Sequence, residues 1–184
     1  DYSDYDRMVT LFTPDYGRID AIARGCRRPK SALVNCVEPF VSGEFQLYAR
    51  RERYTIEQCQ IRESFYELRT DYDRLIHGVY WLKLLECAVM PEEANPELFM
   101  MALRALAHLN YSDLPPELLT MAFEMHLLAS LGYAPRMDAC AQCGKPIDGD
   151  ARFDVALGGA VCLNCPSSAP KVKNMARRIM MKVP

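Results

Sequence analysis

Four cysteines near the C-terminal end place the strongest constraint on how this chain can fold. Cys140 and Cys143 form one Cys-x2-Cys pair, Cys162 and Cys165 form a second, and eighteen residues separate the two pairs. This spacing is typical of a tetrahedral zinc site made of four thiolates. Four sulfur ligands saturate Zn2+ and leave no position open for water. The sequence therefore predicts a structural metal ion and not a catalytic one.

Two other interpretations of the cysteines fit less well than zinc. Disulfides fit poorly, because nothing in the chain resembles a secretory signal and the other thiols follow no pattern. A single Cys-x2-Cys pair could act as a thioredoxin-type redox centre, but two pairs at zinc-ribbon spacing argue against that. We expect the remaining cysteines to be small buried hydrophobic residues. They are Cys26, Cys36, Cys59 and Cys87.

The first third of the chain has the pattern of short β-strands. Residues 8–12 and 18–24 are strand-like around a turn at 14–17, and residues 37–40 continue the pattern. Residues 45–48 and 54–56 read as a hairpin around a polar tip at 50–53. Short strands at roughly ten-residue spacing favour a small barrel or sandwich.

From Thr70 onward the hydrophobic period becomes helical. Thr70 and Asp73 make a capping signature for a first helix, with Leu75, Val79, Leu82, Leu85 and Val89 on its apolar stripe before Pro91. Asn95 is the expected N-cap of a second helix. Its stripe is Leu98, Ala102, Ala105, Leu106 and Leu109. A third helix is expected to run from about residue 112 to Leu131, with Gly132 as its C-terminal cap.

The sequence lacks the residue patterns that enzymes require. There is no phosphate-binding glycine loop, no dinucleotide-type glycine turn and no Gly-x-Ser-x-Gly nucleophile elbow. Each of the three histidines lies on a different expected helix, where a packed or solvent-facing role is the common one. The sequence offers no recognisable combination of a nucleophile, a general base and an oxyanion hole. The sequence contains no run of eighteen apolar residues, so it predicts no membrane-spanning helix. We predict that the protein is not an enzyme.

The net charge of −2 conceals a strong segregation of charge along the chain. Residues 1–69 sum to 0, residues 70–138 to −6 and residues 139–184 to +4. Because the bulk field is weak, any polyanion must bind to a local patch. The candidate patch is a loop after the second strand together with the hairpin tip. Its cations are Arg24, Arg27, Arg28, Lys30, Arg50, Arg51 and Arg53, and Arg18 of the preceding strand is expected to contribute to it.

Such a patch is suited to contacts with phosphate groups. Closely spaced cations repel one another unless an anion screens them, and each phosphate contact releases condensed counterions. Tyr48 and Tyr54 flank the hairpin tip and are available for base stacking. A merely solvated basic loop is the competing interpretation. Five cations near the C-terminus form either a second contact surface or a solvated helix face. They are Lys171, Lys173, Arg177, Arg178 and Lys182.

Several segments resemble the RecO family of bacterial DNA repair and recombination mediators. They are the stretch from Leu11-Phe12-Thr13-Pro14-Asp15-Tyr16-Gly17 into Ala23-Arg24-Gly25-Cys26-Arg27-Arg28-Pro29-Lys30-Ser31, then Leu68-Arg69-Thr70-Asp71-Tyr72, Leu131-Gly132-Tyr133-Ala134-Pro135 and Gly158-Gly159-Ala160-Val161-Cys162. The resemblance covers nearly the whole chain in the family's order. Not every family member keeps the four cysteines, and this chain does.

The resemblance implies an α+β multidomain fold. An N-terminal OB-fold β-barrel would occupy residues 1–69, a helical domain residues 70–138, and an inserted four-cysteine zinc module residues 139–166. Residues 167–184 would begin the C-terminal helices. The family's first barrel strand would precede Asp1 and its final helices would follow Pro184, so we expect the chain to be incomplete at both ends.

The resemblance also implies a function and partners. Such proteins bind single- and double-stranded DNA, anneal complementary strands, and act with RecR to help RecA replace single-strand-binding protein. The family docks the acidic C-terminal tail of single-strand-binding protein on the helical domain, although residues 70–138 are acidic here. We expect a bacterial cytoplasmic, nucleoid-associated protein. Two rivals stay open: a zinc-stabilised protein-interaction scaffold without direct DNA binding, and a thiol oxidoreductase.

Overall fold

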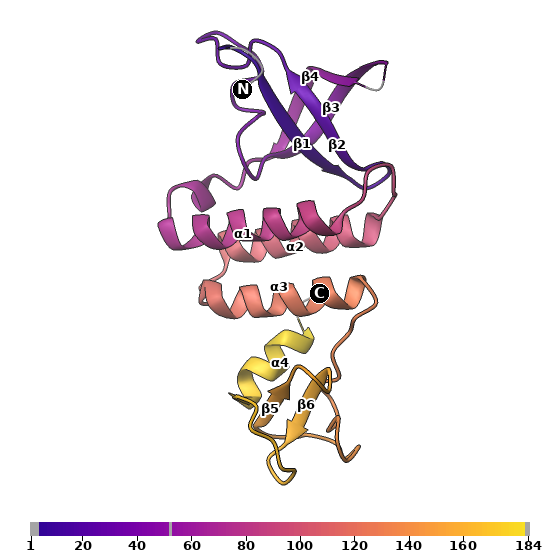
Figure 1. Cartoon of the computed structure of the whole chain (residues 1–184). Coiled ribbons are helices and arrows are strands. Elements are labelled where there is room, and N and C mark those ends of the chain that lie inside the picture. Colours follow the sequence, from indigo (N-terminus) through magenta and orange to yellow (C-terminus); the bar gives the residue numbers. More distant parts are fainter. Residues whose placement is uncertain (1–3, 52, 183–184) are drawn as a thin grey trace. The chain divides into compact units, whose positions relative to one another are not determined.

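The computed structural model describes residues 4–51 and 53–182, and these fall into two compact units (Figure 1). The N-terminal unit is Asp1–Ser112 and the C-terminal unit is Asp113–Pro184. The first contains one sheet, a short 3-10 helix (Tyr66–Arg69) and two α-helices, whereas the second contains a helix, a small sheet around the cysteines and a final helix. The domain boundaries expected from the sequence, between residues 69 and 70 and between residues 138 and 139, differ from this division into two units. They remain predictions.

The sheet of the N-terminal unit has four strands in the order β1-β2-β4-β3. The strands are β1 (Arg7–Thr13), β2 (Gly17–Ala23), β3 (Ser42–Arg50) and β4 (Arg53–Glu63). β1 pairs antiparallel with β2, β3 pairs antiparallel with β4, and β2 and β4 run parallel where Ala21 meets Tyr54 and Ile22 meets Thr55. Within the described residues the sheet does not close into a barrel. Residues 37–40, expected to be strand-like, form a turn instead.

Apolar side chains at alternate positions along the strands form the core of this sheet. Its buried members come from β2, β4 and the connection between β2 and β3, and they are Ala21, Ala23, Cys26, Leu33 and Ile56. Val9 and Leu11 of β1 and Phe45 and Leu47 of β3 pack against them. Since side chains on a strand alternate between faces, the residues between these point to the opposite face. One face of the sheet therefore carries the core cluster, and the opposite face is mixed, with Asp20 and Gln46 exposed and Ile22 buried.

Two helices complete the N-terminal unit: α1 (Tyr72–Ala88) and α2 (Pro96–Tyr111). The N-cap of α1 is Asp71, whose side chain accepts a hydrogen bond from the Arg74 N–H at 3.0 Å, and not Thr70 as the sequence suggested. Asn95 caps α2 as expected, accepting from the Leu98 N–H at 3.0 Å. All five expected stripe residues of α2 are buried, whereas Val79 of the α1 stripe is 49% exposed.

The sheet and the helices are joined through the turn between β1 and β2. The Arg18 N–H donates to the Met90 carbonyl at 3.2 Å, and the Glu92 N–H donates to the Tyr16 carbonyl at 3.0 Å. Gly17 has a φ of 60°, and a Cβ there would lie 2.4 Å from the Met90 carbonyl oxygen. The close approach therefore requires glycine. The rings of Phe12 and Phe99 meet edge to face at 5.4 Å, which ties β1 to α2.

The C-terminal unit contains α3 (Pro116–Ser130), a three-stranded sheet and α4 (Asn174–Lys182). α3 ends as predicted, because Gly132 adopts a φ of 84° and the Tyr133 N–H returns to the Leu128 carbonyl at 2.8 Å. The sheet order is β6-β5-β7, from β5 (Ala151–Asp154), β6 (Gly159–Cys162) and β7 (Lys171–Val172). In the described part of the chain, no helix is long and apolar enough to cross a bilayer.

Candidate metal centre and candidate nucleic-acid interface

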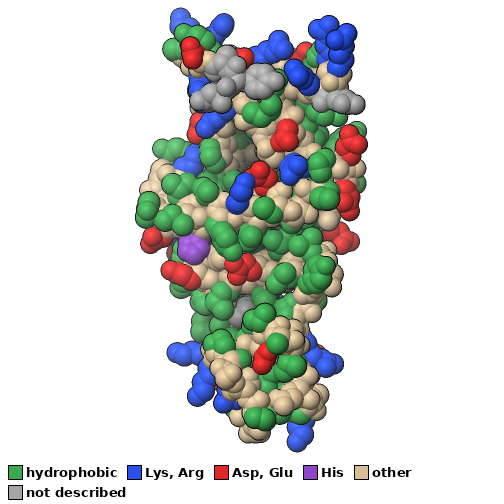
Figure 2. All heavy atoms as spheres, viewed as in Figure 1, with side chains coloured by type: hydrophobic (Ala, Val, Ile, Leu, Met, Phe, Trp, Pro, Cys, Tyr) green, Lys and Arg blue, Asp and Glu red, His purple; other side chains and the backbone are tan. Residues whose placement is uncertain are grey.

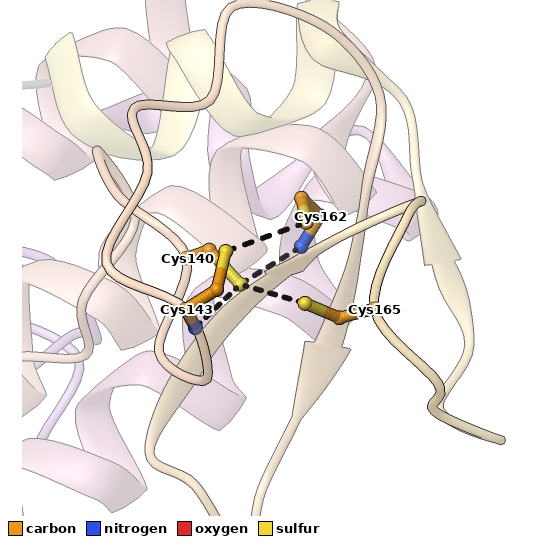
Figure 3. Close-up of side chains that lie close together, drawn as sticks. All are labelled: Cys140, Cys143, Cys162 and Cys165. Atoms are coloured by element: carbon orange, nitrogen blue, oxygen red, sulfur yellow. Dashed lines mark hydrogen bonds between the residues drawn. The ribbon is translucent and has the colours of Figure 1, made fainter.

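The four predicted cysteine ligands converge at one point in the C-terminal unit (Figure 3). Their sulfur atoms all lie within 4.8 Å of one another, and the Cys140–Cys165 and Cys143–Cys162 sulfur pairs are each 3.9 Å apart. A disulfide would need about 2.05 Å. Four sulfurs held at about 2.3 Å in a tetrahedron around Zn2+ lie about 3.8 Å apart. The thiol geometry therefore fits a tetrahedral ion and not two disulfides.

Each Cys-x2-Cys segment folds back on itself so that both thiols point inward. In the first, the Gly144 N–H donates to the Cys140 carbonyl at 2.8 Å, and Gly144 has a φ of 75° that favours glycine. In the second, the Cys165 N–H donates to the Cys162 carbonyl at 3.2 Å. The first segment packs on β6 because the Ala141 N–H donates to the Ala160 carbonyl at 2.8 Å. The two halves of the cluster are thus held by backbone contacts.

Backbone amides favour negative charge on this cluster. The N–H groups of Cys162 and Cys143 both donate to the Cys140 sulfur at 3.4 Å. These bonds, with the Cys162 N–H first, lower the pKa of the buried Cys140 thiol to about 6. The pKa of Cys165 moves the other way, to about 12, first because of its contact with the Cys162 thiol. One thiolate thus disfavours a second, and a divalent cation removes that repulsion.

The core beneath the cysteines is small. Its buried members are Met137, Cys140, Ile147, Ala151, Ala160 and Val161. Met121 and Met125 of α3 and Ala176 of α4 pack against them. The cysteine module is therefore continuous with both helices of the C-terminal unit.

Two arginines that the sequence did not single out for this role support the module. Arg152 of β5 donates to the Leu163 and Cys165 carbonyls at 3.3 Å, across the second cysteine segment. Arg177 of α4 is only 4% exposed and donates to the Met137 carbonyl at 2.7 Å. The suggestion that Arg177 belongs to a second DNA contact surface is therefore wrong. Lys171, Lys173 and Arg178 are exposed, and the side chain of Lys182 lies outside the described part of the chain.

The cations expected to bind DNA occupy two segments of the N-terminal unit. Arg24, Arg27, Arg28 and Lys30 are exposed on the loop that leaves β2, and Arg50, Arg51 and Arg53 are exposed at the β3–β4 hairpin tip. Arg24 follows Ile22 by two residues and Arg53 directly precedes Tyr54, so both segments flank the point where β2 meets β4. Figure 2 shows Lys and Arg side chains gathered at the end of the unit that carries the tip.

The basic loop is held in place by the chain just before β1. The Gly25 N–H donates to the Asp6 carboxylate at 2.8 Å, and the Arg27 N–H donates to the Tyr5 carbonyl at 3.2 Å. The Arg28 guanidinium stacks over the Tyr5 ring at 5.4 Å. The loop is thus an ordered element that presents its cations outward.

Arg18 is placed differently from the other seven cations. Its side chain is half-buried, and Nη1 donates to the Glu86 carbonyl of α1 at 3.1 Å. Its Nε is buried without a hydrogen-bond partner among the described residues. Arg18 therefore joins the sheet to α1 and is not positioned beside the basic loop. The sequence carried no signal for this role, because the partner is a backbone group 68 residues away.

The sheet with its basic end and the four-cysteine cluster do not define a function by themselves, because one fold can host many functions. The family models described as "Recombination protein O N terminal" and "Recombination protein O C terminal" match residues 1–65 and 69–179. The chain belongs to the RecO family. This is a family of recombination proteins and not of enzymes.

The relatives are bacterial proteins named "DNA repair protein RecO". The one from Alkaliphilus metalliredigens is 36% identical over 164 residues, covering 89% of this chain and 67% of the relative. The one from Moorella thermoacetica is 34% identical, covering 90% and 62%. The one from Syntrophomonas wolfei is 33% identical, covering 98% and 71%. The chain thus spans about two thirds of the length of these relatives.

Proposed function

We propose that this protein is a DNA repair and recombination mediator that binds DNA and anneals complementary single strands. The observation that carries the proposal is the placement of seven exposed cations in two segments flanking one strand contact. In line with its family, it would act with RecR, contact the C-terminal tail of single-strand-binding protein, and help to load RecA onto coated strands. It would work in the bacterial cytoplasm, associated with the nucleoid.

The proposed mechanism uses charge neutralisation and no nucleotide. The loop cations Arg24, Arg27, Arg28 and Lys30 would contact phosphates of one strand, and the tip arginines would extend the track. Neutralised strands repel each other less, so two complementary strands can approach and pair. Arg18 is left out of this interface because its guanidinium is engaged with α1.

We propose that the sheet is part of an OB-fold, which is a five-stranded Greek-key barrel. β1 and β3 are the edge strands of the described sheet, and both line an apolar cavity of about 940 Å³ within the N-terminal unit. A further strand pairing with both edges would cover this cavity and close the barrel. In OB-folds, strands of the barrel face and the loops beside them bind oligonucleotides, which agrees with the basic hairpin tip.

The cysteine cluster would hold a structural Zn2+ ion. Four thiolates complete its tetrahedral coordination, so the ion would stabilise the fold and supply no reactive position. Cys140, Cys143, Cys162 and Cys165 would be the ligands. Arg152, which spans the second pair of ligands, would also offset part of the negative charge of the four-thiolate site.

The dependence of DNA affinity on salt tests the proposal. Seven phosphate contacts to a single strand predict a slope of log K against log salt of about −5. The double variant Arg27→Glu, Arg28→Glu should weaken binding and reduce the magnitude of this slope by at least about 1.4. Arg104→Glu is the matched control, because Arg104 is exposed on α2.

A DNA affinity that the reversal leaves unchanged would remove the loop from the interface. If the unaltered protein shows no DNA affinity at physiological salt, the protein-interaction scaffold replaces this proposal. A scaffold fits the acidic middle segment, where residues 70–138 sum to −6.

A further inference from the structure

The outward face of the β3–β4 hairpin carries an ordered series of side chains. Arg50 lies directly opposite Arg53, Tyr48 opposite Thr55, and Gln46 opposite Gln58. Residues directly opposite one another in an antiparallel pair point to the same face, as do alternate residues along each strand. The arginine pair and Tyr48 are therefore successive rows on one face of the sheet, about 7 Å apart along the strand.

The register separates the two tyrosines beside the tip. Tyr48 is 54% exposed on the face opposite the core cluster. Tyr54 is half-buried and packs against the core cluster that contains Ala21 and Ile56, so its ring faces inward. Tyr5, exposed near the basic loop, has the guanidinium of Arg28 stacked on its ring. Of these three rings, Tyr48 has the face that is best placed to receive a ligand.

The arginines Arg50, Arg51 and Arg53 beside Tyr48 concentrate positive charge at the hairpin tip. Like charges directly opposite one another on neighbouring strands are destabilising. Arg51, between them in sequence, adopts a φ of 48°, which is an unfavourable conformation for an arginine. Within residues 4–51 and 53–182, no carboxylate forms an ion pair with any of the three. A phosphate bound here relieves the repulsion.

We propose that Tyr48 is a stacking platform for a base of single-stranded nucleic acid, whose adjacent phosphates bind Arg50 and Arg53. This inference rests on the proposed function and gives it a strand preference. An unpaired base offers its flat face to a tyrosine ring, whereas the bases of a duplex are stacked on one another. The basic loop binds phosphates of either form, and the Tyr48 row distinguishes single strands from duplexes.

The test compares variants of the full chain for binding to an oligothymidylate and to a duplex of the same length, measured by fluorescence anisotropy. Tyr48→Ala should weaken single-strand binding roughly fivefold to a hundredfold, which corresponds to about 1–3 kcal/mol for one stacked base. Duplex binding should change less than twofold, and the salt slope should not change, because no phosphate contact is lost. Tyr48→Phe should restore binding, because the ring and not the hydroxyl makes the contact.

Three comparisons keep the inference separate from the proposed function. Tyr72→Ala, which removes an exposed tyrosine at the start of α1, should leave both affinities unchanged. An oligonucleotide lacking bases should bind the parent protein and Tyr48→Ala equally. If Tyr48→Ala binds single strands as tightly as the parent, while Arg27→Glu, Arg28→Glu does not, the stacking site is refuted and the DNA-binding function stands. Equal losses on single strand and duplex also refute stacking.

Discussion

Removing the proposed Zn2+ ion from the cysteine cluster should unfold the module around it and spare the N-terminal unit. The large apolar side chains buried beneath the cysteines are Met137, Ile147 and Val161. At about 1.5–3 kcal/mol each, their burial contributes about 5–9 kcal/mol. Structural Zn2+ in small modules contributes an apparent binding free energy of about 10–16 kcal/mol. A bound Zn2+ ion would therefore contribute more than these three side chains do, and we expect the module not to remain folded without it.

Hydrogen exchange with peptide resolution measures this prediction directly. After treatment with a strong chelator, or in Cys140→Ser, amides of residues 137–166 should lose protection while those of residues 7–23 keep it. Cys87→Ser is the control, because Cys87 is an exposed thiol outside the cluster. The reasoning is refuted if the protein releases one equivalent of zinc and the exchange pattern of residues 137–166 does not change.

Two further predictions concern the N-terminal unit. Arg74→Ala should destabilise this unit by about 1.5–3 kcal/mol, because the Arg74 guanidinium donates to the Leu109, Asn110 and Ser112 carbonyls at the end of α2. Chemical denaturation should show this loss of unfolding free energy. The control Arg104→Ala, at an exposed position, should lose less than about 0.5 kcal/mol. The Phe65 N–H first, then the Ser64 N–H and the Tyr111 hydroxyl, hold the pKa of Glu63 below its ordinary value of 4.5. The contribution of Glu63 to stability is therefore complete above pH 4.5 and is lost as the pH falls through the lowered pKa. In that acidic range the melting temperature of Glu63→Gln should depend less on pH than that of the unaltered protein. An unchanged pH dependence would contradict the assignment.

Features that depend on neighbouring residues in sequence could be predicted well. The cysteine spacing anticipated the converging thiols because each pair folds within one tight turn. The stripe and cap of α2 were also anticipated, since Asn95 and Leu98 are three residues apart. The predicted cap of α1 lies one residue too early, because Thr70 and Asp71 are both good capping residues. Only the backbone geometry selects Asp71.

Features that depend on tertiary contacts could not be predicted. Arg18 and Arg177 look like surface cations in the sequence, but each reaches a backbone carbonyl far along the chain. The same holds for the distinction between Tyr48 and Tyr54. Both flank the hairpin tip, and only the strand register shows that one ring faces outward and the other inward.

The basic segments of the N-terminal unit are proposed to bring DNA strands together, and this is the central claim. The most direct test is annealing of two complementary single strands, coated with their single-strand-binding protein, by the full-length protein without ATP. We predict fast annealing that is lost in Arg27→Glu, Arg28→Glu and retained in Arg104→Glu. Absence of annealing by the unaltered protein, with its fold intact and its metal bound, would contradict the claim.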